Sequence, residues 1–245
     1  MRLRPYLGPT AIILGAVLIL LLHVIPPTSR ISPLWRTISE YGLASDKWVF
    51  NVAVCLVALG SAVIFFTLRQ RLRPVAVVFG ALWTTGLLMI VAFPKADWSM
   101  RGADHSDGTV HRMASLVAFI CLPIAVMLGR TIFPPGSFAR MLALWLGVTS
   151  LVWFVPIITG VVLMGFTGHP FWQVVPLGLV ERLMALNEIV AVCALGSGLL
   201  PDRHVLPASG GERRVVPVGP AGGPDHSGQP GHQVEFAGPD VAERY

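Results

Sequence analysis

The chain has 245 residues, of which 54% are hydrophobic and 13% charged, and its mean hydropathy is +0.69. Soluble domains carry about 25% charged residues, so this composition excludes a single soluble core. The net charge of +5 does not indicate nucleic-acid binding, because the basic residues lie mainly beside the ends of apolar segments, where they set membrane topology. Only Lys47 and Lys95 of the 18 basic residues are lysine, a bias that we attribute to a GC-rich bacterial genome.

Six apolar segments, each close to the length of about 20 residues that crosses a bilayer as a helix, follow one another along the chain. They cover residues 6–25, 48–68, 75–93, 111–129, 141–164 and 177–200. The predicted fold class is therefore all-α, a polytopic membrane helical bundle with six transmembrane helices. The basic start of the chain and the connections at 69–73 and 130–140, which carry arginine and no acid, place both the N-terminus and the C-terminus in the cytoplasm.

This pattern predicts two regions. Residues 1–200 form the six-helix transmembrane domain, and we expect it to lie in the plasma membrane as a multi-pass protein. From position 201 the chain is rich in Gly, Pro and polar residues and has almost no apolar periodicity. Such a segment buries too little apolar surface to offset its conformational entropy, so residues 201–245 are predicted to be a disordered cytoplasmic tail.

Under this topology, the acidic residues and histidines before position 200 gather on the outer side. The acids are Glu40, Asp46, Asp97, Asp104, Asp107, Glu181 and Glu188, and the histidines are His23, His105, His111 and His169. Acidic residues contribute little to topology. The asymmetry therefore favours a polar site on the outer face over chance and loop solubility.

The connection at 93–111 carries the residues that could bind a divalent metal, the one cofactor that the sequence suggests. Asp104, His105, Asp107 and His111 offer carboxylate and imidazole ligands within eight residues. Their spacing matches no known metal motif. The alternative is a helix start, capped by Asp107 or Thr109, with interfacial histidines bonded to loop carbonyls.

The last apolar segment carries Glu181, Arg182 and Glu188. If its helix begins near Leu177, Glu188 lies about 16 Å along it, close to the bilayer midplane. A carboxylate at that depth costs a few kcal/mol and is normally paired, protonated or turned toward a cavity. Two interpretations remain open: a hydrogen bond or ion pair that ties this helix to its neighbours, or a functional cavity.

Short motifs on the outer side resemble those of a bacterial membrane family, domain-of-unknown-function family 998. The matching features are Ser39-Glu40-Tyr41-Gly42, Phe93-Pro94 with Asp97, His111 with Ala114, and the acidic last helix. The resemblance covers about residues 5–200 and implies a six-helix fold with an outward-facing polar cluster. The stretch 38–42 is also similar, more distantly, to an element of the Frag-type and damage-regulated autophagy modulator membrane proteins.

We therefore predict an integral membrane protein that binds a lipid or other amphiphile in an outward-facing polar pocket, with membrane lipids as its partners. The residues expected to line the pocket are Glu40, Asp97, His111, Glu181, Arg182 and Glu188. One alternative is a metal-dependent membrane-embedded hydrolase that uses His105 and His111 with acids of the same connection. Another is a small proton-coupled transporter that uses Glu188 as its relay.

Overall fold

The structure is a computed structural model that describes residues 4–95 and 106–200. Two sequence predictions fall outside these ranges: the disordered tail at 201–245, and most of the connection at 93–111. The side chains of residues 106 and 107, at the start of a helix, are not described either.

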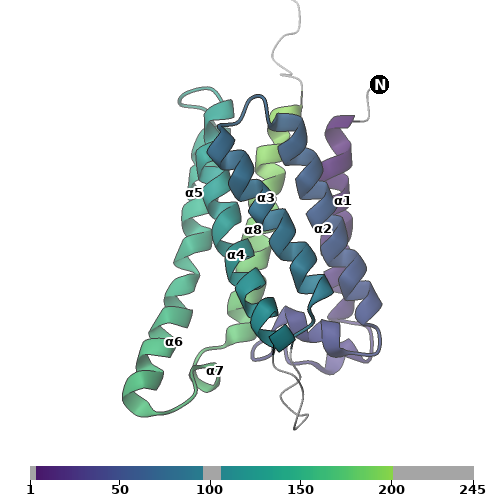
Figure 1. The fold of residues 1–245 in the computed structure, drawn as a ribbon, viewed down its shortest axis with the longest axis vertical. Coiled ribbons are helices and arrows are strands. Elements are labelled where there is room, and N and C mark those ends of the chain that lie inside the picture. The colour runs from purple at the N-terminus through teal and green to yellow at the C-terminus, as the bar shows by residue number, and fades with distance from the viewer. Residues whose placement is uncertain (1–3, 96–105, 201–245) are drawn as a thin grey trace, which may run out of the picture. The chain divides into compact units, whose positions relative to one another are not determined.

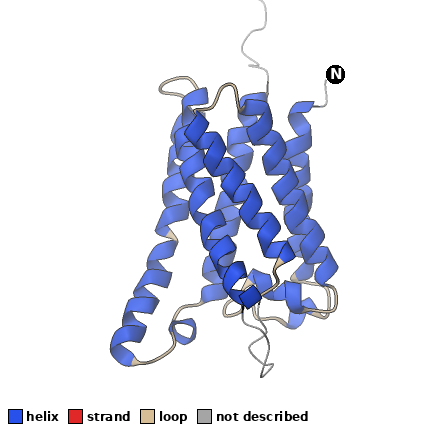
Figure 2. Ribbon diagram, viewed as in Figure 1, coloured by secondary structure: helices blue, strands red, loops and turns tan. Residues whose placement is uncertain are grey.

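All regular structure in the described part of the chain is helical (Figure 2). The long helices are α1 (Arg4–Leu22), α2 (Lys47–Leu68), α3 (Pro74–Ala92), α4 (Ser106–Gly129), α5 (Phe138–Val152), α6 (Phe154–Thr167) and α8 (Leu177–Gly196). The short ones are η1 (Thr28–Arg30), η2 (Ile38–Leu43), η3 (Arg130–Ile132), α7 (Phe171–Val174) and η4 (Ser197–Leu199). The predicted all-α class is confirmed.

Five stretches of the described chain are long and apolar enough to cross a membrane, and α5 and α6 count as one of them. Helix α8 is not among the five, although it has 20 residues, because three of them are charged. The helical membrane bundle is thus confirmed, whereas six spans and the sides of the termini stay predictions.

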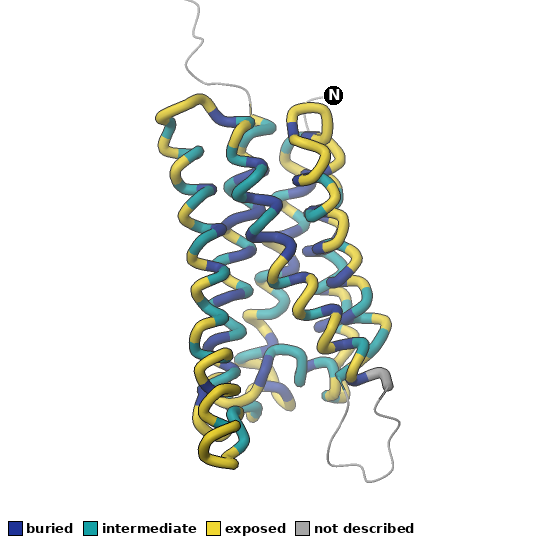
Figure 3. The backbone as a smooth tube through the Cα atoms, turned by 60° about the vertical axis from the view of Figure 1, so that its left-hand side comes forward, coloured by how far each residue is buried: buried dark blue, intermediate teal, exposed yellow. Residues whose placement is uncertain are grey.

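Buried stretches of the backbone lie toward the interior of the bundle and exposed stretches toward its outside (Figure 3). Many of the exposed residues are large and apolar. Ile64, Leu122 and Leu195, from three different helices, are all fully buried. Phe66 and Trp145 are 66% and 59% exposed. An apolar exterior of this kind suits contact with lipid, because a bilayer solvates apolar side chains as well as a protein core does.

Two helices approach so closely that only glycine fits between them. A Cβ atom on Gly60 of α2 would lie 2.6 Å from the carbonyl oxygen of Gly8 in α1. Small residues at such contacts let helix backbones meet inside a membrane. This contact fixes α1 against α2.

The predicted fifth helix is divided into two. Sequence reasoning placed one helix at 141–164, whereas α5 ends at Val152 and α6 begins at Phe154. Pro156 lacks an N–H, and its ring clashes with the carbonyl group four residues earlier, which is that of Val152. Beyond the break, α6 and α7 diverge from the other helices (Figure 1), and α6 is largely exposed.

Figure 1 places the start of α1 and the end of α8 at one end of the bundle. The opposite end, which we call the loop end, consists of the α1–α2 connection at 23–46 and the start of α8. The loop end carries most of the polar side chains discussed below.

Candidate functional site

The α1–α2 connection is fixed to α8 by the guanidinium group of Arg182. Its Nε donates to Nε2 of His23 over 2.8 Å, and its Nη2 donates to the hydroxyl of Tyr41 over 2.9 Å. Its Nη1 donates to the carbonyl oxygens of Pro33 and Arg36, over 2.9 and 2.7 Å. All these acceptors are neutral, so Arg182 acts here as a branched donor that holds the connection in place.

His23 and Gly178 complete this attachment. Nδ1 of His23 donates to the carbonyl oxygen of Ile19 over 2.8 Å, which leaves Nε2 as the acceptor for Arg182. A Cβ atom on Gly178 would lie 2.3 Å from the carbonyl oxygen of Arg36. The connection therefore rests directly on the backbone at the start of α8.

Glu181 precedes Arg182 and contacts the same connection. One of its carboxylate oxygens, Oε2, accepts a hydrogen bond of 2.7 Å from the backbone N–H of Ile38. This N–H opens η2, where helix N–H groups lack an internal partner. Glu181 thus replaces a side-chain cap, because the N-cap residue Thr37 makes no capping bond.

Glu40 joins η2 to the end of α3. Its carboxylate accepts from Nζ of Lys95 over 3.0 Å and from Nε of Arg36 over 2.5 Å. Lys95 also donates to the hydroxyl of Thr37 over 2.9 Å. The carboxylate is therefore shared between two cations from different segments.

His111 of α4 is 4% exposed and is oriented by the end of α3. Its Nδ1 lies 2.9 Å from the carbonyl oxygen of Phe93. Because a carbonyl oxygen only accepts, Nδ1 carries the proton in this contact and Nε2 is free to accept. Helix α4 already begins at Ser106, so Asp107 and Thr109 lie within its first turn and do not precede it as the capping alternative required.

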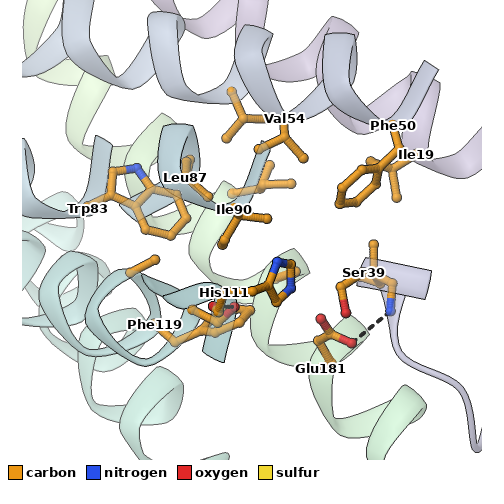
Figure 4. Close-up of a pocket in the computed structure, with 16 residues that line it drawn as sticks. Ile19, Ser39, Phe50, Val54, Trp83, Leu87, Ile90, His111, Phe119 and Glu181 are labelled. Carbon is orange, nitrogen blue, oxygen red and sulfur yellow. Dashed lines mark hydrogen bonds between the residues drawn. The ribbon is translucent and has the colours of Figure 1, made fainter. Parts of the chain in front are cut away.

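Beneath the α1–α2 connection lies a mostly apolar cavity of about 110 Å³, which we call the apolar chamber. Its polar lining residues are Ser39, His111, Ser115 and Glu181, and its apolar ones include Phe50, Val54, Trp83, Phe119, Ala185 and Ile189. Figure 4 shows His111, Ser39 and Glu181 close together on one side and Trp83 on the other. The imidazole, hydroxyl and carboxylate groups therefore lie on one side of the chamber, and on the other side Trp83 contributes an indole N–H without a partner among the described residues.

A second cavity, the polar chamber, adjoins the first at the loop end and has a volume of about 60 Å³. The two share the lining residues Ser39, Phe50, Ile90 and His111. The polar chamber is also lined by Lys47, Asn51 and Lys95. His111 thus stands where a polar compartment meets an apolar one.

Glu188 is fully buried but lies outside the residues that line either chamber. Neither of its oxygens has a hydrogen-bond partner among the described residues. Ala185 and Ile189, on the same helix, do line the apolar chamber. The neighbouring Asn187, in contrast, ties α8 to α5 by donating to the carbonyl oxygen of Leu146 over 2.8 Å.

The structure brings together some of the predicted site residues. His111 and Glu181 line the apolar chamber, and Glu40 and Arg182 fix the segments around it. Asp97, Asp104 and His105 lie outside the described residues, as does the side chain of Asp107. Within the described ranges, no three His, Cys, Asp or Glu side chains are grouped so as to hold a metal, and the metal site stays a prediction.

Sequence reasoning missed Lys47, Asn51 and Trp83 as lining residues. Asn51 and Trp83 carry no signal in the sequence, because each falls within an apolar segment. The scarcity of lysine was a usable signal: the two lysines of the chain, Lys47 and Lys95, both line the polar chamber. We had attributed this scarcity to genome composition alone.

Residues 9–198, which include both chambers, match a family model described as "Protein of unknown function (DUF998)". The chain belongs to this family. No curated protein and no solved structure matches the chain. Membership confirms the resemblance on the outer-side motifs, whereas the distant similarity to the Frag-type and autophagy modulator proteins stays a prediction.

Proposed function

We propose that this member of the family binds a lipid or other amphiphile, with an apolar chain in the apolar chamber and a polar group in the polar chamber. The observation that supports this proposal most is that His111 lines both chambers, so that the two cavities adjoin at this residue. A ligand that fills both compartments needs an apolar part and a polar part joined at that point.

The size and lining of the chambers favour part of a ligand over a whole lipid. A cavity needs roughly 10–15 Å³ to hold one water molecule. The apolar chamber, with about 110 Å³, therefore holds a few groups of that size, which is one segment of an acyl chain. A membrane lipid gains little from moving its chain out of the bilayer, because lipid tails are as apolar as leucine. Selectivity therefore comes from the shape of the apolar chamber and from polar contacts around His111.

The proposal predicts that filling the apolar chamber abolishes binding. Ala185 lines this chamber, and the variant Ala185→Phe places a ring in it. The matched control is Leu186→Phe on the same helix, because the side chain of Leu186 is 58% exposed on the outside. Both variants and the wild type are extracted in mild detergent, and co-purifying amphiphiles are counted by native mass spectrometry.

We expect a stoichiometric amphiphile on the wild type and on Leu186→Phe, and its loss from Ala185→Phe. Equal retention by both variants, or a wild type without any bound amphiphile, would contradict the proposal. Metal analysis of the same wild-type preparation tests the hydrolase alternative, since stoichiometric metal that is lost in His111→Ala would favour it.

A further inference from the structure

We infer that the polar chamber is an anion site, so that the ligand is an amphiphile with a phosphate or carboxylate group. This inference rests on the proposed function and specifies the chemistry of its polar end. The observation behind it is that both lysines of the chain, Lys47 and Lys95, line this one small cavity. The remaining 16 basic residues are all arginine.

The lining of the polar chamber is cationic. Among the described residues, its lining includes two ammonium groups and no acid. The side chain of Lys47 makes no hydrogen bond or ion pair within the described part of the chain; its backbone N–H donates to the carbonyl oxygen of Ala44 over 3.1 Å. Lys95 donates to Thr37 and Glu40, and the third N–H of its ammonium group has no partner among the described residues.

Of the three described acids near this chamber, Glu181 and Glu40 are bonded to other groups. Glu181 accepts from Ile38 and lines the apolar chamber. Glu40 is held by Arg36 as well as by Lys95, so it keeps one cation if a ligand takes the other. Asp46, next to Lys47, has a buried carboxylate oxygen without a hydrogen-bond partner among the described residues, but it is not part of the lining.

Neutral donors in the same lining complement the two lysines. The side-chain amide of Asn51 has no hydrogen-bond partner among the described residues, and Ser39, whose hydroxyl lies 3.0 Å from that of Thr37, lines both chambers. Lys47 and Asn51 also belong to the first turns of α2, where the helix dipole favours an anion. Phosphate and carboxylate oxygens accept several charge-assisted hydrogen bonds at once, which fits this set of donors.

The test compares a zwitterionic lipid with two anionic amphiphiles. The full chain is placed in nanodiscs of phosphatidylcholine that contain either phosphatidylglycerol with the same acyl chains or palmitate, which separates a phosphate head group from a free carboxylate. Retained lipid is measured by native mass spectrometry after release into detergent. The variants are Lys47→Gln with Lys95→Gln, and Arg73→Gln as a control, because Arg73 is an exposed cation at the other end of α3.

We expect the wild type and Arg73→Gln to retain one anionic amphiphile several-fold over phosphatidylcholine, and the double variant to lose this preference while still binding an amphiphile. The inference is overturned if the wild type binds phosphatidylcholine equally well, or if the double variant keeps the preference. Binding that remains sensitive to Ala185→Phe in those cases leaves the proposed function standing. If no amphiphile binds at all, the proposed function fails together with the inference.

Discussion

At the scale of single residues, Glu188 stands out because its carboxyl group lies in the core without a hydrogen-bond partner among the described residues. An unsatisfied buried polar group costs about 1–3 kcal/mol. Methionine fills a similar volume without this cost. We therefore predict that Glu188→Met raises the thermal unfolding midpoint of the detergent-solubilised protein, whereas Glu188→Ala, which leaves a cavity, lowers it.

The comparison of these two variants also tests the interpretations that the sequence left open. If Glu188→Met destabilises the protein as much as Glu188→Ala does, the carboxyl group has a partner that the described residues do not show. If Glu188→Met is more stable than the wild type but has lost proton-coupled transport, the carboxyl group of Glu188 is kept for function at a cost in stability. That outcome would favour the transporter alternative, in which Glu188 is the relay.

At the scale of elements, the α1–α2 connection depends on α8 through Arg182. Lysine has three donors on a single nitrogen, whereas the acceptors His23, Pro33, Arg36 and Tyr41 surround a planar guanidinium group. Hydrogen bonds to charged groups contribute about 1.5–3 kcal/mol each. We predict that Arg182→Lys increases amide hydrogen exchange in residues 23–46 by at least about tenfold, since about 1.4 kcal/mol corresponds to one such factor.

The control for this experiment is Arg73→Lys, which keeps the charge at an exposed position on the opposite end. Unchanged exchange in Arg182→Lys would mean that the connection is held by other contacts, such as the close approach of Gly178 to Arg36. The same exchange data would show whether the lining residues Ile38 and Ser39 move with the connection.

The helices themselves were largely predictable, because apolar length and proline position are local signals. Predicted and observed ends of α2 and α3 differ by at most one residue. The break at Trp153 was not predicted, since sequence reasoning placed one helix over 141–164. The folding of the α1–α2 connection over the chambers was not predictable, because its bonds to Arg182 join residues more than 140 positions apart.

The candidate site was predicted only in part, because its two cavities are formed by segments that lie far apart in the sequence. His111 and Glu181 are unusual in an apolar sequence and were found by their chemistry. Asn51 and Trp83 lie within helices, so their roles emerge only once the helices are packed around the two chambers. A cavity is a property of several segments at once, and no single segment of this chain encodes it.

At the scale of the whole molecule, the orientation of α8 decides the number of crossings. Three charged residues lower its hydropathy, yet Arg182 and Glu181 bond to the α1–α2 connection and Glu188 is buried. Helix α8 packs against α1, α2, α4 and α5. The charged side chains of α8 are therefore not required to contact lipid. The packing of the bundle is consistent with α8 as a sixth membrane-crossing helix.

Six crossings, with the arginine-rich connections in the cytoplasm, would place the loop end outside the cell, and labelling with a membrane-impermeant maleimide can test this prediction. Leu34→Cys puts an exposed thiol on the α1–α2 connection, and Gln70→Cys puts one on the α2–α3 connection at the opposite end. We predict labelling of Leu34→Cys in intact cells and of Gln70→Cys only after permeabilisation, because arginine-rich connections stay in the cytoplasm. The wild type, with cysteines 55, 121 and 193 inside helices, gives the background. The reverse pattern would turn both chambers toward the cytoplasm, and their ligand would then come from the inner leaflet.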